Sequence, residues 1–168
     1  MSPLIGIGVA ALTVGGAAYG ARNLVNLKTS LNYGIKLGMV SSIIISSFFF
    51  IFADPLSFIF SYSADSAVLA SSIVEALRVL CFFILFMPFG VLAGNIFQSM
   101  GKGTTSLIIT VLRSFIMEVI FAGLFAFIFA WGVVGVYSGL VCGMSVGSLV
   151  GYAYINYYLN KHRSYFED

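Results

Sequence analysis

The chain has 168 residues, of which 60% are hydrophobic and 8% are charged, and its mean hydropathy is +1.06. Because a soluble domain carries about 25% charged residues, this composition excludes an ordinary water-soluble domain and indicates a chain that lies in lipid. In lipid every backbone polar group must be satisfied within the chain, so only helices or closed barrels can cross. The apolar runs are long and lack the alternation of barrel strands, which predicts helices.

Charged residues divide the sequence into apolar segments. Residues 1–21 carry no charge and precede a basic loop that begins at Arg22. A second uncharged run, 37–53, ends before Asp54, and a third, 79–101, leads into a polar glycine turn. Each of these runs is close to the roughly 20 residues that an α-helix needs to cross a bilayer.

The last uncharged run extends over 42 residues, from 119 to 160. It is about twice the length of one crossing, so it must fold back, and we expect the turn at AWGVVG, residues 130–135. The sequence therefore predicts an all-α integral membrane protein with a single transmembrane domain. Its five transmembrane helices are expected near residues 3–20, 34–53, 67–99, 104–130 and 134–159.

The positions of the basic residues predict the orientation. Lysine and arginine in short loops gather on the cytoplasmic side of a membrane. They occur in the first and third predicted loops and in the C-terminal tail, whereas the second loop holds only acidic residues and the fourth has no charge. This alternation fits five crossings. We expect a multi-pass protein of the cell membrane with its N-terminus outside and its C-terminus in the cytoplasm.

Glycine recurs at every fourth position of the last predicted helix, at Gly135, Gly139, Gly143, Gly147 and Gly151. A glycine inside a helix costs about 1 kcal/mol, so a favourable contact must offset the series. In lipid, small residues let two helix backbones approach closely. We expect these glycines to pack the last helix against a neighbour; a flexible gating helix is the alternative.

Two charged side chains fall inside the fourth predicted helix, where each is costly and is a functional candidate by default. Glu118 lies 14 residues beyond Thr104, about 21 Å along an α-helix. We expect either a protonation or cation site there or a structural hydrogen bond. Arg113 lies five residues earlier, about 140° around an α-helix, which predicts that the two do not pair. Glu75 and Arg78, three residues apart, are expected to form a surface pair.

The third predicted helix contains a proline and two polar amides. Pro88 frees a carbonyl and kinks a helix, so with Gly90 and Gly94 it forms the predicted bend. Asn95 and Gln98 lie near the predicted cytoplasmic end of this helix. We expect them to form hydrogen bonds between helices, with contact to a substrate as the alternative.

No motif in the sequence indicates an enzyme. GMSVG at 143–147 matches a nucleophile elbow, but it lies in an apolar helix and the single histidine, His162, is in the predicted tail. GIGVAA at 6–11 lacks the strand and the acidic residue of a dinucleotide-binding turn. Cys81 and Cys142 fit neither a disulfide framework nor a metal motif. We expect no enzymatic activity, no metal or organic cofactor and no nucleic-acid partner.

Several stretches, taken in order, resemble the second half of a multidrug and toxic compound extrusion (MATE) transporter. They are SPLIG and GGAAYGARN near the N-terminus, then FADPLSFIF, EALRVLCFFILFMPFGVLAGNIFQSMGKGTTSLIITVLRS and WGVVGVYSGL. The region from Pro88 to Arg113 carries the resemblance most strongly. The resemblance implies a twelve-helix protein of two six-helix lobes around a central cavity. The chain is similar to helices eight to twelve, a partial six-helix lobe.

The resemblance implies antiport, in which entry of Na⁺ or H⁺ drives the efflux of amphipathic, often cationic compounds. Some members carry an acidic cation ligand near the position of Phe89, so coupling would depend here on a missing lobe or on Glu118. Asn95, Gln98 and Arg113 are the candidates for the substrate cavity. The first lobe and helix seven are absent from the sequence, so the expected partner is a separate N-terminal lobe or a second copy in a parallel homodimer.

Two other functions stay open at the level of the sequence. Lipid-linked oligosaccharide flippases of the same superfamily share the architecture, but they usually need cationic cavity residues for a pyrophosphate, and only Arg113 could serve inside a span. The other is a truncated membrane subunit that does not transport.

Overall fold

The computed structural model describes residues 2–60, 67–128 and 132–166, and nearly all of these residues are helical. The helices are α1 (Ser2–Gly20), α2 (Leu24–Ile51), α3 (Ala53–Phe60), α4 (Ala67–Ser99), α5 (Gly103–Val111), α6 (Glu118–Gly123) and α7 (Gly132–Lys161). Two π-helical segments, Leu112–Met117 and Leu124–Ile128, continue α5 and α6, and a short 3₁₀-helix, Arg163–Phe166, follows α7. Five helical stretches are long and apolar enough to cross a membrane, which confirms the five-span, all-α prediction.

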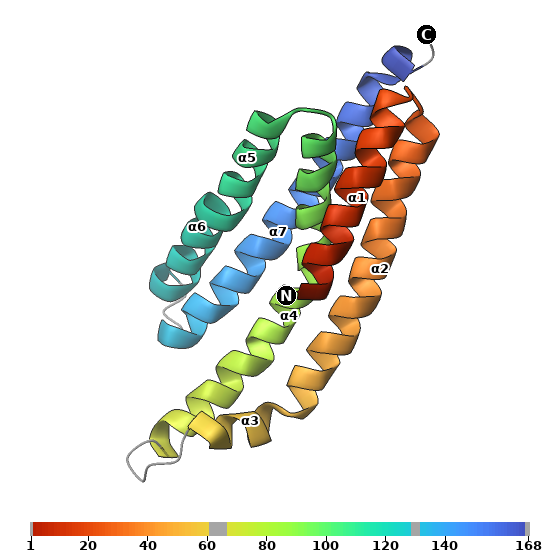
Figure 1. Cartoon of the computed structure of the whole chain (residues 1–168). Coiled ribbons are helices and arrows are strands. Elements are labelled where there is room, and N and C mark those ends of the chain that lie inside the picture. The colour runs from red at the N-terminus through yellow and green to blue at the C-terminus, as the bar shows by residue number, and fades with distance from the viewer. Residues whose placement is uncertain (1, 61–66, 129–131, 167–168) are drawn as a thin grey trace.

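The bundle is built around α4, which packs against α1, α2, α5 and α7. Figure 1 shows the long helices running roughly parallel, with the short α3 across the end where α2 passes into α4. The α1–α2 turn, the α4–α5 turn and the C-terminal end of α7 all lie at the opposite end. That end carries the basic residues that the sequence places in the cytoplasm.

The second span begins ten residues earlier than the predicted 34–53, at Leu24. Asn23 caps this helix, because its side chain accepts a hydrogen bond of 2.9 Å from the backbone N–H of Asn26. Lys28 and Lys36 therefore belong to the helix itself, whereas Arg22 lies in the turn before it. Lys28 donates a hydrogen bond of 2.6 Å to the side chain of Asn160 near the end of α7. The helix begins earlier than the predicted span because a charged, capped helix can continue beyond the hydrocarbon.

The predicted turn at 130–135 is described only in part, since residues 129–131 lie outside the described ranges. Helix α7 begins at Gly132. The fourth span, predicted as one helix over 104–130, is described as α5, α6 and the two π-helical segments.

The buried core lies where α1, α2, α4 and α7 meet. The largest fully buried hydrophobic side chains are Leu27, Leu31, Leu92, Ile96, Phe97, Ile155 and Leu159. Large apolar side chains on the outside of the bundle are exposed instead, as in Ile44 at 65% and Phe115 at 67%. Such an outer surface suits contact with lipid tails, which are as apolar as the side chains themselves.

The glycines of α7 lie against the backbone of the helix that runs from α5 through α6. A Cβ added to Gly143 would stand 2.6 Å from the carbonyl oxygen of Met117 and 2.7 Å from Cα of Glu118. A Cβ on Gly147 would stand 2.9 Å from Cα of Arg113. Gly139 faces Ala122 in the same way, Gly151 faces Ile109, and Gly135 is buried. The structure therefore places the glycine series at a backbone-to-backbone contact, which we call the glycine seam.

The glycine seam depends on the π-helical segment Leu112–Met117. Successive glycines, four residues apart on α7, meet Ala122, Glu118, Arg113 and Ile109. The step from Glu118 to Arg113 is five residues, whereas the other two steps are four. A π-helical turn holds one more residue than an α-helical turn, so it absorbs the extra residue and keeps one face of the helix on α7.

The variant Gly143→Ala tests the glycine seam. The added methyl group would meet backbone atoms, which cannot rotate away as a side chain can. Overpacking of this kind costs about 1–3 kcal/mol, and we expect a loss near the upper end in the free energy of unfolding, measured by titration of detergent micelles with SDS. Gly123→Ala is the matched control, because no atom lies within 4 Å of its added Cβ. Equal losses in the two variants would contradict the close contact.

Candidate functional site

Arg113 is buried between three helices, with 7% of its surface exposed. It belongs to the π-helical segment, and its side chain extends to Gly90 of α4, whose missing Cβ leaves space for Nη1. A Cβ on Gly90 would also stand 2.6 Å from Cδ of Arg113 and 2.9 Å from Oγ of Ser148 on α7. Gly90, Gly147 and Ser148 thus enclose the arginine, and we call this enclosure the arginine notch.

Three buried polar atoms in the arginine notch have no hydrogen-bond partners. Nε and Nη1 of Arg113 and Oγ of Ser148 are buried, and none has a hydrogen bond within the described part of the chain. Arginine does not lose its proton in proteins, and a buried charge is costly unless it is paired. Arg113 lies ten residues after Gly103, about 15 Å along the helix, near the middle of a hydrocarbon core about 30 Å thick.

Glu118, the ion-coupling candidate, begins α6 and is partly buried. The sequence predicted that it lies about 140° from Arg113, but that angle assumed an α-helix. The segment between them is π-helical, and in a π-helix the backbone bond joins residues five apart. The two residues therefore lie on neighbouring positions of one face. Their charges interact electrostatically, although no ion pair within 4.0 Å joins them in the described chain.

The two amides predicted for the substrate cavity lie on different sides of α4. Gln98 donates a hydrogen bond of 3.2 Å from Nε2 to Oγ of Ser106 and so links α4 to α5. Asn95 is partly buried and its Nδ2 lies against Gly8 of α1. The structure brings neither of them to Arg113.

A polar face of the fourth span lies opposite the glycines of α4. Ser106, Thr110 and Arg113 follow the spacing of one helix face, and Thr110 donates a hydrogen bond of 2.9 Å to the carbonyl oxygen of Ser106. A Cβ on Gly94 would stand 3.3 Å from Oγ of Ser106, and Gly90 faces Arg113. The glycines predicted to bend α4 therefore lie where this polar face meets the helix.

Pro88 lies inside α4, which continues as a helix through it. The proline ring is fully buried, and a Cβ on Gly38 of α2 would stand 2.8 Å from Cβ of Pro88. The next residue, Phe89, packs edge-on against Tyr152 of α7, with 5.5 Å between ring centroids. This stretch of α4 is thus fixed on two sides, by α2 and by α7.

Arg78 forms an ion pair of 2.9 Å with Asp54, which joins α4 to α3. The side chain of Glu75, with which the sequence predicted a pair, lies outside the described side chains. Both members of the observed pair are exposed, at 46% and 65%. Exposed pairs of this kind contribute little to stability.

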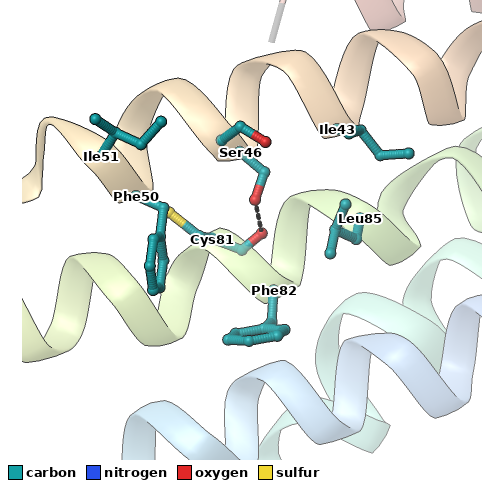
Figure 2. Close-up of a pocket in the computed structure, with 8 residues that line it drawn as sticks. Ile43, Ser46, Phe50, Ile51, Cys81, Phe82 and Leu85 are labelled. Carbon is teal, nitrogen blue, oxygen red and sulfur yellow. Dashed lines mark hydrogen bonds between the residues drawn. The ribbon is translucent and has the colours of Figure 1, made fainter.

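Three grooves of the bundle are lined mainly by apolar side chains. One of about 420 Å³ lies between α2 and α4, with Ser46 and Ser47 in its lining. Figure 2 shows Ser46 donating a hydrogen bond of 3.0 Å to the carbonyl oxygen of Cys81. A second, of about 620 Å³, runs between α1 and α2. A third, of about 310 Å³, is lined by Arg113, Leu112 and Tyr154 among others. Among the described residues no cluster of His, Cys, Asp or Glu could hold a metal ion.

Sequence reasoning identified Arg113 and Glu118 but missed Ser148 and the geometry that joins the two charges. Ser148 could have been found from the sequence, because it is a polar residue that directly follows Gly147 in an apolar helix. The π-helical segment has no comparable signal, since LRSFIM contains neither proline nor glycine.

Comparison with known proteins shows what the whole chain resembles. A protein-family model described as MatE matches residues 1–124. The chain is similar to an inward-facing structure of a multidrug resistance MATE family transporter of the MOP superfamily, with 33% identity and a TM-score of 0.93; the match covers 97% of this chain and 37% of the other. An outward-facing structure of such a transporter matches with 34% identity and a TM-score of 0.90, over 96% and 36%.

A third similar structure is a MOP superfamily transporter from Pyrococcus furiosus, for which a reversed polarity of the binding pocket is said to suggest a different function. It shares 33% identity with a TM-score of 0.91, over 96% of this chain and 36% of the other. No curated protein matches the chain. The chain therefore spans a little over a third of the length of the transporters that it resembles.

The arginine notch can be tested with a double-mutant cycle. Gly90→Ala is expected to lower the free energy of unfolding by about 1–3 kcal/mol, because its methyl group would overlap the guanidinium. In an Arg113→Ala background the same change should cost less than about 0.5 kcal/mol, since the space is then free. Unfolding in SDS measures both values. The same cost in both backgrounds would show that the arginine does not fill the notch.

Proposed function

The chain belongs to the MatE family, and on that premise we propose that it forms the C-terminal half of an antiporter that exports amphipathic or cationic compounds. The observation that carries this proposal is the match of nearly the whole chain to multidrug resistance MATE transporters. The chain is a multi-pass membrane protein with their fold, and it covers 37% of the length of one of them. A complementary lobe, or a second copy of the chain, would complete the substrate cavity.

We propose Glu118 as the residue that binds the coupling ion, Na⁺ or H⁺. Its partly buried carboxylate lies deep in a span, and the described residues give it no hydrogen bond. Protonation or a bound cation would remove the cost of that charge. Phe89, at the position where some members carry an acidic ligand, is packed against Tyr152.

The proposed substrate class, amphipathic or cationic compounds, is inferred from the family and not from the lining of a described pocket. The Pyrococcus furiosus transporter, with its reversed pocket polarity, is as similar to this chain as the multidrug transporters are. Export of cationic compounds is still the better proposal, because the residues that line the grooves between α1 and α2 and between α2 and α4 include no positive charge that would repel a cation.

A chimera tests this function. The chain would replace the corresponding third of a multidrug resistance MATE transporter, and ethidium efflux driven by an imposed H⁺ or Na⁺ gradient would be measured in proteoliposomes. We expect efflux above that of empty liposomes. In the same chimera Glu118→Gln, which keeps the size but removes the charge, should abolish the gradient dependence. No efflux from a chimera that is inserted and monodisperse would overturn the proposed function, and unchanged coupling in the variant would exclude Glu118.

We propose further that the end of the bundle with the C-terminus is cytoplasmic. Lys102, in the α4–α5 turn, lies 4.9 Å from the ring centroid of Tyr158. A hydrogen bond to Tyr158 is the main reason that the pKa of Lys102 lies above its ordinary value, so this lysine is charged at neutral pH. A positive charge there agrees with the positive-inside rule.

Labelling of single cysteines tests the orientation. In a variant without the native cysteines, Asp54→Cys should react with a membrane-impermeant maleimide on intact cells, whereas His162→Cys should react only after the cells are opened. The reverse pattern would contradict the proposed orientation.

A further inference from the structure

The charge of Arg113 is not balanced by the helices packed against it. Helix α7 has no charged side chain before Lys161, and its titratable groups are tyrosines and Cys142. Helix α5 has no titratable side chain, and α4 has no charged residue between Arg78 and its end at Ser99. The other acidic residue of these helices, Glu75, lies fifteen residues before Gly90 on α4, so among the described side chains Glu118 is the acidic group near the arginine notch.

The distance between the two charges is short along the helix. One π-helical segment separates them and places them on the same face. A helix turn rises about 5.4 Å, which an arginine side chain can span by changing its rotamer. Nε and Nη1 of the guanidinium have no acceptor, so no hydrogen bond of these two atoms holds the side chain in the arginine notch. Exchange of the arginine notch for the carboxylate would therefore break no hydrogen bond of these two atoms.

We propose that Arg113 is a built-in cation that competes with the coupling ion for the carboxylate of Glu118. This inference rests on the proposed role of Glu118. When Na⁺ or H⁺ leaves, the guanidinium takes its place on the carboxylate; when the ion binds, the guanidinium returns to the arginine notch, where the structure shows it. The carboxylate is then never left as an uncompensated charge in hydrocarbon, which would be costly. Arg113 acts as a positioning residue in this scheme.

A soluble anion bound to Arg113 is the competing explanation. Nε and Nη1 have no accessible surface in the notch, and the groove that Arg113 lines beside α7 is mostly apolar and holds no second cation that would attract an anion. Glu118 needs only a change of rotamer. The geometry therefore favours the carboxylate of the chain itself.

The experiment measures cation binding to the purified 168-residue chain in nanodiscs of neutral lipid. Bound ²²Na⁺ and proton uptake are each followed against concentration, with chloride and with gluconate as the anion. The test variant is Arg113→Met, because an apolar side chain of similar length is tolerated well at a buried ionic site. Arg113→Lys restores the charge, and Arg78→Gln removes an arginine from the exposed pair with Asp54. Size-exclusion chromatography confirms that each variant is monodisperse.

Removal of the competitor should tighten binding of the coupling ion. An opposite charge a few ångströms away changes the occupancy of a carboxylate by about tenfold or more, so Arg113→Met should lower the half-saturating concentration about tenfold. Arg113→Lys should return it towards the original value, and Arg78→Gln should leave it unchanged. An unchanged value in Arg113→Met, or a change that occurs only in chloride, would overturn the inference.

The role of Glu118 is tested separately in the same assay. Glu118→Gln should abolish saturable binding of the coupling ion. If binding is lost in Glu118→Gln but is the same in Arg113→Met and the unaltered chain, the proposed function stands and the competition by Arg113 is wrong. If Glu118→Gln binds the ion as before, the proposed role of Glu118 fails, and the inference fails with it.

Discussion

The backbone contact between α7 and the fourth span is the constraint on which the rest of the structure depends. Lipid tails are as apolar as leucine, so the helices gain little from burying apolar surface, and close van der Waals contact must hold them together. The glycine seam provides that contact because Gly139, Gly143 and Gly147 have no side chain to separate α7 from the backbone of the fourth span. It also fixes the rotation of the fourth span, which turns Ser106, Thr110 and Arg113 towards α4.

That fixed rotation explains how a charged side chain can lie at the middle of the bundle. Arg113 is held between the glycine of one neighbour and the glycine and serine of another, away from lipid. Enclosure by protein keeps the guanidinium away from the hydrocarbon and so lowers the free-energy cost of burying it, but it does not balance the positive charge. An uncompensated charge in a close-packed lobe is a store of free energy that a conformational or binding change can release. The proposed coupling at Glu118 uses that property.

Composition and charge positions were sufficient to predict the spans, because hydrophobic length and the cost of charge in lipid act locally on the chain. Five crossings and the helical class followed directly. The start of α2 did not, because the sequence pattern cannot distinguish a basic loop from a basic helix end that Asn23 caps. The relation of Glu118 to Arg113 was also inaccessible. It depends on a π-helical turn that no residue of LRSFIM requires, and that the packing of α7 imposes from outside.

The π-helical segment also has a consequence for how this span can change in evolution. It acts as a one-residue insertion that puts the two halves of the helix in phase with α7. Deletion of a single residue between 112 and 117 would remove the extra residue, and an uninterrupted α-helix would then bring Ile109, Arg113, Glu118 and Ala122 to the four-residue spacing of the glycines on α7. If the unchanged sequence wound as an α-helix instead, everything beyond residue 117 would turn by about 100°, and either Ile109 and Arg113 or Glu118 and Ala122 could face the glycines, but not both pairs. This short stretch can therefore lose one residue and keep its face on α7, whereas the glycines that meet the backbone of the fourth span cannot be exchanged for larger residues without a clash.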